Sequence, residues 1–288
     1  MSAATSRYEA PAALAAPAPP PALERGDGAA EIVFTRAGLA RLYQRTPCRV
    51  LFPRPEPGDL PLAALLTTSG GLAGGDRLRL SVALEEGARA VVATAAAEKV
   101  YRSLGPDAAV TISLAAEEGA WLEWLPQETI LFDGARLVRR IAAALAPGAR
   151  LIAAETLVFG RAARGERFAR GLLSESWRVR CGGRLVWADA LRLDGDIGRR
   201  LAAPAGFGGA GALATVLYVG TDAASHLAAA RALAAAGGGA ASLVNGLLLA
   251  RFLAPRAEVV RDALARYVAG LRAVAAGLPA TLPRLWHA

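Results

Sequence analysis

The chain has 288 residues, enough for one large domain or two small ones with a sizeable core. Its net charge of +8 and its pI of about 10.4 suggest nucleic-acid binding at first sight. However, Lys99 is the single lysine among 33 basic residues, and the scattered arginines lack the interleaved aromatic residues that stack on bases. Nucleic-acid binding is therefore the weaker alternative, and we expect none.

Several classes of protein are excluded by missing signals. No window has the uninterrupted apolar length of a membrane helix, and the N-terminus lacks the basic and apolar regions of a secretory signal. Residues 1–30 are rich in alanine and proline, which predicts a disordered tail. Cys48 and Cys181 have no CxxC companion, so neither a zinc site nor a disulfide is indicated. We expect a cytoplasmic protein with reduced thiols and no membrane contact.

The first half of the chain reads as strands separated by glycine-rich turns. Residues 69–76 form a glycine-rich loop that ends in Asp76. This loop lacks the Gly-Lys-Ser/Thr ending of a phosphate-binding loop, so tight turning is its expected role. Residues 77–84 alternate between apolar and polar side chains, which predicts a strand.

A short turn sequence recurs through the middle of the chain. It reads Glu86-Gly87-Ala88, then Glu118-Gly119-Ala120, then Pro147-Gly148-Ala149, with successive glycines 32 and 29 positions apart. Each turn precedes an apolar strand. Similar turns at such spacing predict a mainly β fold of stacked β-coils or layered sheets.

The stretch from residue 120 to 135 combines apolar side chains with acids. It reads as a strand, a proline bend, a second short strand and a turn at Asp133-Gly134. Alternate residues of a strand share a face, so Trp121, Glu123 and Leu125 should point the same way. A carboxylate among such neighbours must be hydrogen-bonded, ion-paired or exposed to a wet cavity.

A further interior acid is predicted later in the chain. Residues 151–159 are apolar on both faces except at Glu155 and Thr156, so they should form a central strand. Burying an unpaired carboxylate typically costs several kcal/mol. Glu155 therefore needs water, an arginine or a passing cation to offset that cost. Glu166 follows in a polar bend.

The last quarter of the chain changes character. Residues 206–211 fit G-x-G-x-x-G, but no buried strand precedes them and no helix follows, so they read as a loop rather than a dinucleotide site. Residues 243–253 read as one strand. One helix is expected to begin at Asp222, which should cap it, and another is expected from Pro255, with its apolar residues in a single stripe. The terminal Trp286 should pack on its own domain.

The motifs of common hydrolases are missing. There is no G-x-S-x-G and no H-E-x-x-H, and neither His226 nor His287 is next to a cysteine. Imidazole and thiolate ligands for a tight metal site are therefore scarce. A β-helical carbohydrate-active enzyme with paired carboxylates is the alternative to a non-enzymatic protein. Its carboxyl groups would lie about 5–10 Å apart, whereas Glu128 and Asp133 would be about 16 Å apart in an extended chain.

Five motifs occur in order along the chain. They are Ser69–Leu78, Lys99–Ser103, Trp124–Ile130, Gly165–Phe168 and Pro283–Trp286. Together they resemble the UreD (also named UreH) urease accessory family, and the resemblance extends from about Glu31 to the C-terminus. One departure is that Ala95 and Glu98 stand where the family often has glutamine and threonine.

The resemblance implies a single domain over residues 31–288, with layered, β-helix-like sheets and two α-helices near the C-terminus. It also implies a scaffold without catalytic residues or a tightly bound cofactor. Such a scaffold binds apo-urease and recruits UreF and, through UreF, the GTPase UreG for nickel insertion. We expect the helix from Pro255 and the tail at residues 283–286 to border the surface that meets UreF.

The family resemblance further implies a hydrophilic passage for nickel in transit. Weak oxygen ligands suit such a passage because they let an ion move on. The candidate passage acids are Asp76, Glu123, Glu128, Asp133, Glu155 and Glu166.

Overall fold

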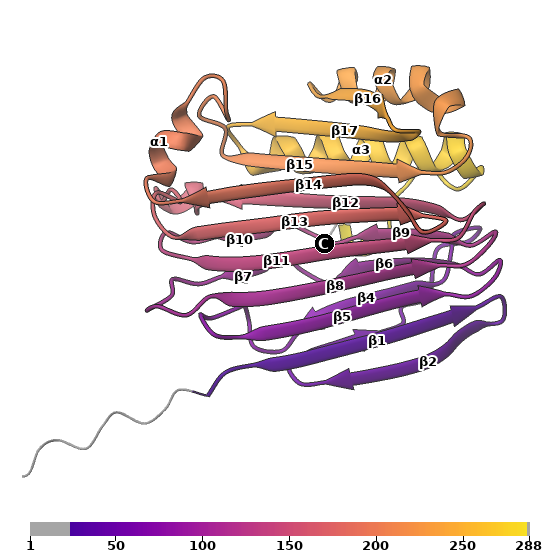
Figure 1. Ribbon diagram of the computed structural model, residues 1–288, viewed down its shortest axis with the longest axis horizontal. Helices are drawn as coiled ribbons and strands as arrows, with labels where there is room; N and C mark the ends of the chain where they lie inside the picture. Colours follow the sequence, from indigo (N-terminus) through magenta and orange to yellow (C-terminus); the bar gives the residue numbers. More distant parts are fainter. Residues whose placement is uncertain (1–23, 287–288) are drawn as a thin grey trace, which may run out of the picture.

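The computed structural model describes residues 24–286. Within this range the chain is mainly β, with two large sheets packed face to face and helices in the C-terminal part (Figure 1). The expected β-helix-like fold with two helices near the C-terminus is confirmed. Strand β1 (Asp27–Thr35) begins inside the range expected as a tail, and residues 1–23 of that range lie outside the described part.

Seven strands form the first sheet. Their order is β14 (Arg184–Asp194), β13 (Leu172–Cys181), β11 (Arg136–Leu145), β8 (Ala108–Ala116), β5 (Arg77–Leu84), β1 and β2 (Gly38–Arg45). Strands β1, β5, β8, β11 and β13 pair in parallel, while β2 and β14 pair antiparallel at the two edges.

Ten strands form the second sheet. Eight of them run in the order β16 (Ala240–Val244), β17 (Leu247–Ala254), β15 (Ala212–Val219), β12 (Arg150–Phe159), β9 (Trp121–Leu125), β6 (Arg89–Thr94), β4 (Leu62–Thr67) and β3 (Cys48–Leu51). The short strands β7 (Glu98–Val100) and β10 (Thr129–Leu131) pair with each other, and β10 also pairs with β12.

The chain winds between the two sheets as a β-solenoid of about four turns. The recurring turn glycines make this possible because all three adopt left-handed backbone angles, with φ of +65° at Gly87, +69° at Gly119 and +80° at Gly148. The Gly87 N–H donates a hydrogen bond of 2.9 Å to the Glu118 carbonyl, so turns of successive coils stack. The predicted stacked β-coils are confirmed.

In the described part of the chain, the two longest helices lie on the outer face of the second sheet (Figure 1). Helices α2 (Leu227–Ala236) and α3 (Ala257–Ala276) pack there, and the short α1 (Ile197–Ala202) follows β14. Three 3-10 turns complete the described chain, at Ala162–Arg164, Ala223–His226 and Arg284–Trp286.

Two apolar layers result from this arrangement. One lies between the sheets and the other between the second sheet and the helices. Strand β9 serves both layers, because Leu122 and Trp124 face the first sheet while Trp121 and Leu125 face the helices. This confirms the alternation predicted for β9.

Some C-terminal details differ from the sequence-based expectations. Residues 243–253 are not one strand, because Asn245 and Gly246 have φ of 47° and 83° and close a hairpin between β16 and β17. Asp222 does not cap α2 but accepts a 2.6 Å hydrogen bond from the Tyr218 hydroxyl. Residues 206–211 form the expected loop, and the buried Trp286 packs on its own domain as predicted.

Candidate functional site

The six acids predicted from the sequence occupy three regions of the fold. Each accepts hydrogen bonds or forms an ion pair within the described part of the chain. They are Asp76, Glu123, Glu128, Asp133, Glu155 and Glu166. Their surroundings differ enough that each region must be considered separately.

Glu123 and Glu128 lie between the second sheet and α3. Glu123 is fully buried and accepts hydrogen bonds from Trp121 Nε1 at 2.9 Å and from Arg272 Nε at 3.1 Å. Burial raises the pKa of Glu123. Glu128 accepts a 2.8 Å hydrogen bond from Arg261 Nη1. Because both arginines belong to α3, these two acids fasten the helix to the sheet.

Asp133, Glu166 and Asp76 hold loops in place. Asp133 Oδ1 accepts hydrogen bonds of 2.9 Å from the backbone N–H groups of residues 169 and 170. Glu166 pairs with Arg161, whose hydrogen bond lowers the pKa of Glu166. Asp76 accepts two backbone hydrogen bonds, at 2.7 and 2.8 Å. All three therefore have a local structural role.

Glu155 is the predicted acid that lies between the two sheets. It is on β12, and its carboxylate pairs with Arg139 of β11 in the opposite sheet. The same guanidinium pairs with Glu175, which is its neighbour in the parallel register of β11 and β13, with an Nε–Oε2 distance of 2.8 Å. The three side chains are only 4–8% exposed. Two buried carboxylates thus share one buried arginine.

The polar cluster continues across the core towards β7. Arg139 Nη1 donates a 2.8 Å hydrogen bond to Thr129 Oγ1, and Thr129 is the neighbour of Glu98 in the pairing of β10 with β7. Glu98 accepts a hydrogen bond of 3.2 Å from Thr67 Oγ1 on β4. The name polar track is used below for six residues: Thr67, Glu98, Thr129, Arg139, Glu155 and Glu175.

Both ends of the polar track reach a hollow in the surface. Glu175 lines a hollow of about 260 Å³ near β14, β15 and β17, where Arg251 and Asp189 pair across the two sheets. Thr67 and Glu98 line a second hollow of about 190 Å³. The track therefore lies between two openings of the inter-sheet core.

Carboxylates outnumber cations in the polar track. The track contains three acids and one arginine, which pairs with Glu155 and Glu175 but not with Glu98. Burial raises the pKa of Glu155 to about 8, against the opposing effect of Arg139. Burial likewise raises the pKa of Glu98 to about 7. Near neutral pH Glu155 is therefore mostly protonated, whereas Glu98 is protonated only in part. A divalent cation could displace those protons, because carboxylate oxygens are ligands for hard and borderline metal ions.

Sequence reasoning missed Arg139 and Glu175, and it treated Glu98 only as a departure from the family. A signal was present, because every second residue from Leu137 to Leu145 faces the core and only Arg139 breaks the apolar pattern. Glu175 breaks the same pattern in β13. Within residues 24–286, no three histidine, cysteine or acidic side chains are placed to hold a metal ion together.

Comparison with known proteins identifies the group to which this sequence belongs. Residues 26–287 match the family described as UreD urease accessory protein. The chain belongs to the UreD family. It is 46% identical to the urease accessory protein UreD of Methylobacterium sp. (strain 4-46) over 267 residues, which are 90% of this chain and 92% of that protein. This assignment confirms the resemblance carried by the five motifs.

Other bacteria have similar UreD proteins. The protein of Granulibacter bethesdensis is 47% identical over 239 residues, covering 82% of this chain and 99% of that protein. The protein of Brucella suis is 42% identical over 271 residues, covering 92% and 95%. The similarity thus covers nearly the whole described fold.

Membership of the UreD family makes the chain a non-catalytic factor of urease maturation. The carbohydrate-enzyme alternative is therefore wrong. The two acids considered for such an enzyme have structural roles instead: Glu128 accepts a hydrogen bond from Arg261 of α3, and Asp133 accepts hydrogen bonds from backbone N–H groups of a loop. In residues 24–286, none of the helices has the length and apolar character needed to cross a membrane.

Proposed function

We propose that this UreD chain is the scaffold through which nickel reaches apo-urease, and that the polar track is part of the path of the metal. The observation that supports this most is the excess of buried carboxylates over arginine between two surface hollows. A core that needed only structural neutrality would match Arg139 with one acid. The additional acids supply oxygen ligands that a cation in transit could bind once it displaces their protons.

Exchange of protons for metal explains how such a path would work. Glu98 and Glu155 hold protons in the metal-free chain, because burial raises their pKa values to about 7 and about 8. Glu98 and Glu155 would lose these protons when nickel binds, and they would regain protons from water when nickel leaves. Arg139 keeps the binding weak, since a cation beside a guanidinium gains less energy. Weak oxygen ligands favour passage over retention.

The other five predicted acids remain proposed contacts for nickel. Glu123 and Glu128 would serve a path on the helix side, and the three loop acids would serve its entrances. Each of these five acids has its own hydrogen-bonding or ion-pairing partner, whereas Glu155 shares Arg139 with Glu175. Glu155 is therefore the one of the six predicted acids that the charge balance supports best.

The partners proposed for this cytoplasmic scaffold are apo-urease, UreF and, through UreF, UreG. The exposed side of α3 supports a UreF surface there, because Val259 and Val274 are 46% and 50% exposed. Such apolar side chains on a helix can dock into the groove of another protein. The 3-10 turn at Arg284–Trp286 lies against α3, since Arg261 donates a 2.6 Å hydrogen bond to the Trp286 carbonyl.

Replacing Glu155 by glutamine tests the path. Arg139 keeps Glu175 as its counter-ion in this variant, so we expect the free energy of unfolding to change by only about 1 kcal/mol. We expect co-purification with urease to be unchanged and the nickel content of urease to fall by about tenfold. Glu118→Gln is the matched control, because Glu118 is exposed in a turn. The measurements are urea unfolding, co-purification and metal analysis of urease.

Two outcomes would contradict the proposal at different levels. Normal nickel loading by a well-folded Glu155→Gln complex would remove this residue from the path. Full urease activity in a strain that lacks the chain would refute the scaffold function itself.

A further inference from the structure

The outer face of the seven-stranded sheet carries no helix in the described part of the chain (Figure 1). The side chains that point outward on its inner strands are mostly alanine, serine and threonine. They include Ser81, Ala83, Ala109, Thr111, Ser113, Ala115, Ala142, Ala144, Ser174 and Ser176. Because these side chains are short, another protein can approach the sheet closely over a wide area.

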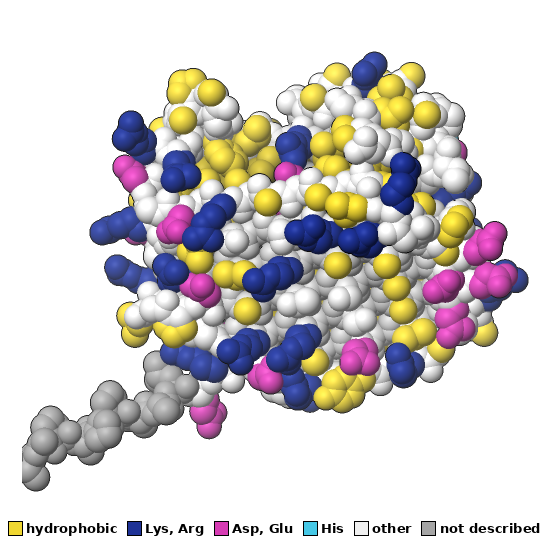
Figure 2. Space-filling view, in the orientation of Figure 1, with side chains coloured by type: hydrophobic (Ala, Val, Ile, Leu, Met, Phe, Trp, Pro, Cys, Tyr) yellow, Lys and Arg dark blue, Asp and Glu magenta, His cyan; other side chains and the backbone are white. Residues whose placement is uncertain are grey.

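Arginines project from this flat background. Figure 2 shows basic side chains spread over the face, with acidic side chains mostly towards its edges and a group of them at the right-hand end. The arginines of its strands that are both outward and exposed are Arg41, Arg45, Arg77, Arg79, Arg140, Arg178, Arg180 and Arg192. The outward carboxylates are Asp27, Glu31 and Asp194. The face therefore has a strong excess of positive charge.

The strand register places several of these arginines at regular intervals. Arg79 of β5 and Arg140 of β11 both align with Thr111 of β8, so they stand two strands, about 10 Å, apart. Asp27 already pairs with Arg79. In contrast, Arg140 and Arg178 form no ion pair or side-chain hydrogen bond with any described residue.

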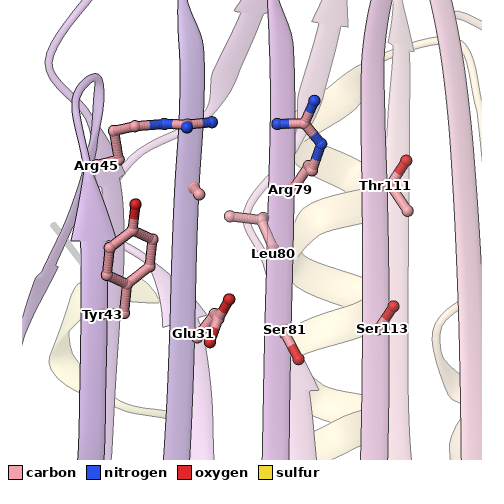
Figure 3. Close-up of a pocket in the computed structure, with 9 residues that line it drawn as sticks. Glu31, Tyr43, Arg45, Arg79, Leu80, Ser81, Thr111 and Ser113 are labelled. Atoms are coloured by element: carbon pink, nitrogen blue, oxygen red, sulfur yellow. The ribbon is translucent and has the colours of Figure 1, made fainter.

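A shallow hollow of about 720 Å³ marks one end of the face. Figure 3 shows Tyr43 and Arg45 of β2 on one side of it, with Ser81, Thr111 and Ser113 on the neighbouring strands. An aromatic residue next to arginine is typical of the positions that contribute most to protein–protein binding.

We propose that this arginine face is the docking surface for an acidic surface of apo-urease. That the partner is apo-urease rests on the proposed function, whereas the positive charge of the face follows from its own arginines. Seven strands about 4.8 Å apart and about 27 Å long present roughly 800 Å², the share of one protein in a standard interface. Opposite charge would orient the two proteins and accelerate their association.

Other occupants fit this face less well. A second copy of the chain would place arginines against arginines, which costs binding energy. Nucleic acid would find Tyr43 as the single aromatic side chain among the outward residues of the sheet. UreF is proposed to bind the helical side of the molecule, which lies beyond the second sheet (Figure 1).

Charge reversal at Arg140 and Arg178 tests the proposal. The Arg140→Glu/Arg178→Glu variant of the full chain is compared with an Arg54→Glu/Arg102→Glu control, whose arginines are exposed outside the sheet. Binding to immobilised apo-urease, to UreF and to duplex DNA is measured at about 50 and about 300 mM salt. Melting temperatures establish that both variants fold.

We expect the arginine-face variant to bind apo-urease about tenfold or more weakly than the control, with UreF binding unchanged. Wild-type binding to apo-urease should weaken at the higher salt. Equal apo-urease affinity of the two variants would overturn the docking surface and leave the proposed function intact. Selective loss of UreF or DNA binding would also overturn it, by assigning the face to that molecule. If the wild type binds neither urease nor UreF, the proposed function fails together with this inference.

Discussion

At the scale of single residues, the balance of charge decides how each interior acid behaves. Glu123 and Glu128 each contact an arginine of α3. Glu98 instead accepts a hydrogen bond from the hydroxyl of Thr67 and forms no ion pair with a described residue. Burial therefore dominates at Glu98 and raises its pKa to about 7. The protonation of Glu98 should therefore make the free energy of unfolding depend on pH.

The stability of the protein should fall as the pH rises from about 5 to about 7, in part because of Glu98. The unfolded chain releases this proton near the ordinary pKa of 4.5, whereas the folded chain keeps it to about 7. The folded state thus binds more protons within this window, so the free energy of unfolding decreases with pH. Glu98→Gln should remove about 1–3 kcal/mol of this decrease.

Urea unfolding of both proteins at intervals between about pH 5 and pH 8 measures this difference. Glu118→Gln, an exposed substitution, serves as the control. Parallel stability–pH curves for wild type and Glu98→Gln would show that Glu98 titrates normally.

At the scale of elements, α3 is held to the second sheet by arginines as well as by apolar contact. Arg272 is fully buried, pairs with Glu123 and Asp59, and donates a 2.6 Å hydrogen bond to the Thr281 carbonyl. Arg261 joins the helix to Glu128 and to the terminal turn. Removing one member of such a set leaves a buried charge without its counter-ion. The helix, the sheet and the C-terminal turn should therefore unfold together.

Trp286→Ala should lower the free energy of unfolding by about 3–5 kcal/mol, because it empties a packed site. The indole is 3% exposed, donates a hydrogen bond of 3.3 Å to the Leu125 carbonyl, and has the Arg261 guanidinium 5.2 Å from its centre. Arg284→Ala is the control, because that side chain is 86% exposed. Urea unfolding compares the two variants.

UreF binding by Trp286→Ala, measured where the variant stays folded, separates packing from docking. Undiminished affinity would limit Trp286 to packing. A loss of stability no greater than that of Arg284→Ala would contradict the packing role.

At the scale of the whole molecule, stability depends on how closely successive coils approach. Gly171, just before β13, has φ of +132°, and a Cβ there would clash with the carbonyl oxygen of Ala135, just before β11. Gly38, the first residue of β2, has a comparable φ of +114°, but a Cβ there would meet nothing within 4 Å. The two glycines thus separate backbone strain from crowding between coils.

Gly171→Ala should therefore cost about 2 kcal/mol more than Gly38→Ala. The reason is that both substitutions strain the backbone, while only the first separates two coils. Thermal or urea unfolding of the two variants measures the difference, with the wild type as reference. Equal losses would mean that contact between these coils adds nothing to stability.

The sequence by itself determined the local structure and the family. Alternation predicted β5 and the two faces of β9, and the three turn glycines predicted stacked coils, because periodicity and left-handed turns are properties of short segments. Five short motifs were enough to indicate the UreD family. The prediction of one strand over residues 243–253 is wrong, because Asn245-Gly246 closes a hairpin between β16 and β17.

The tertiary structure decided which acids meet which arginines. The sequence indicated that Glu155 needed compensation, but Arg139 lies 16 positions earlier and on the opposite sheet. Glu175 and Glu98 join the same cluster through strand register, which no local pattern encodes. The arginine face likewise exists only because parallel pairing aligns β5, β8, β11 and β13. Such groupings depend on long-range pairing, and the energy of a charge depends on every neighbour that the fold brings to it.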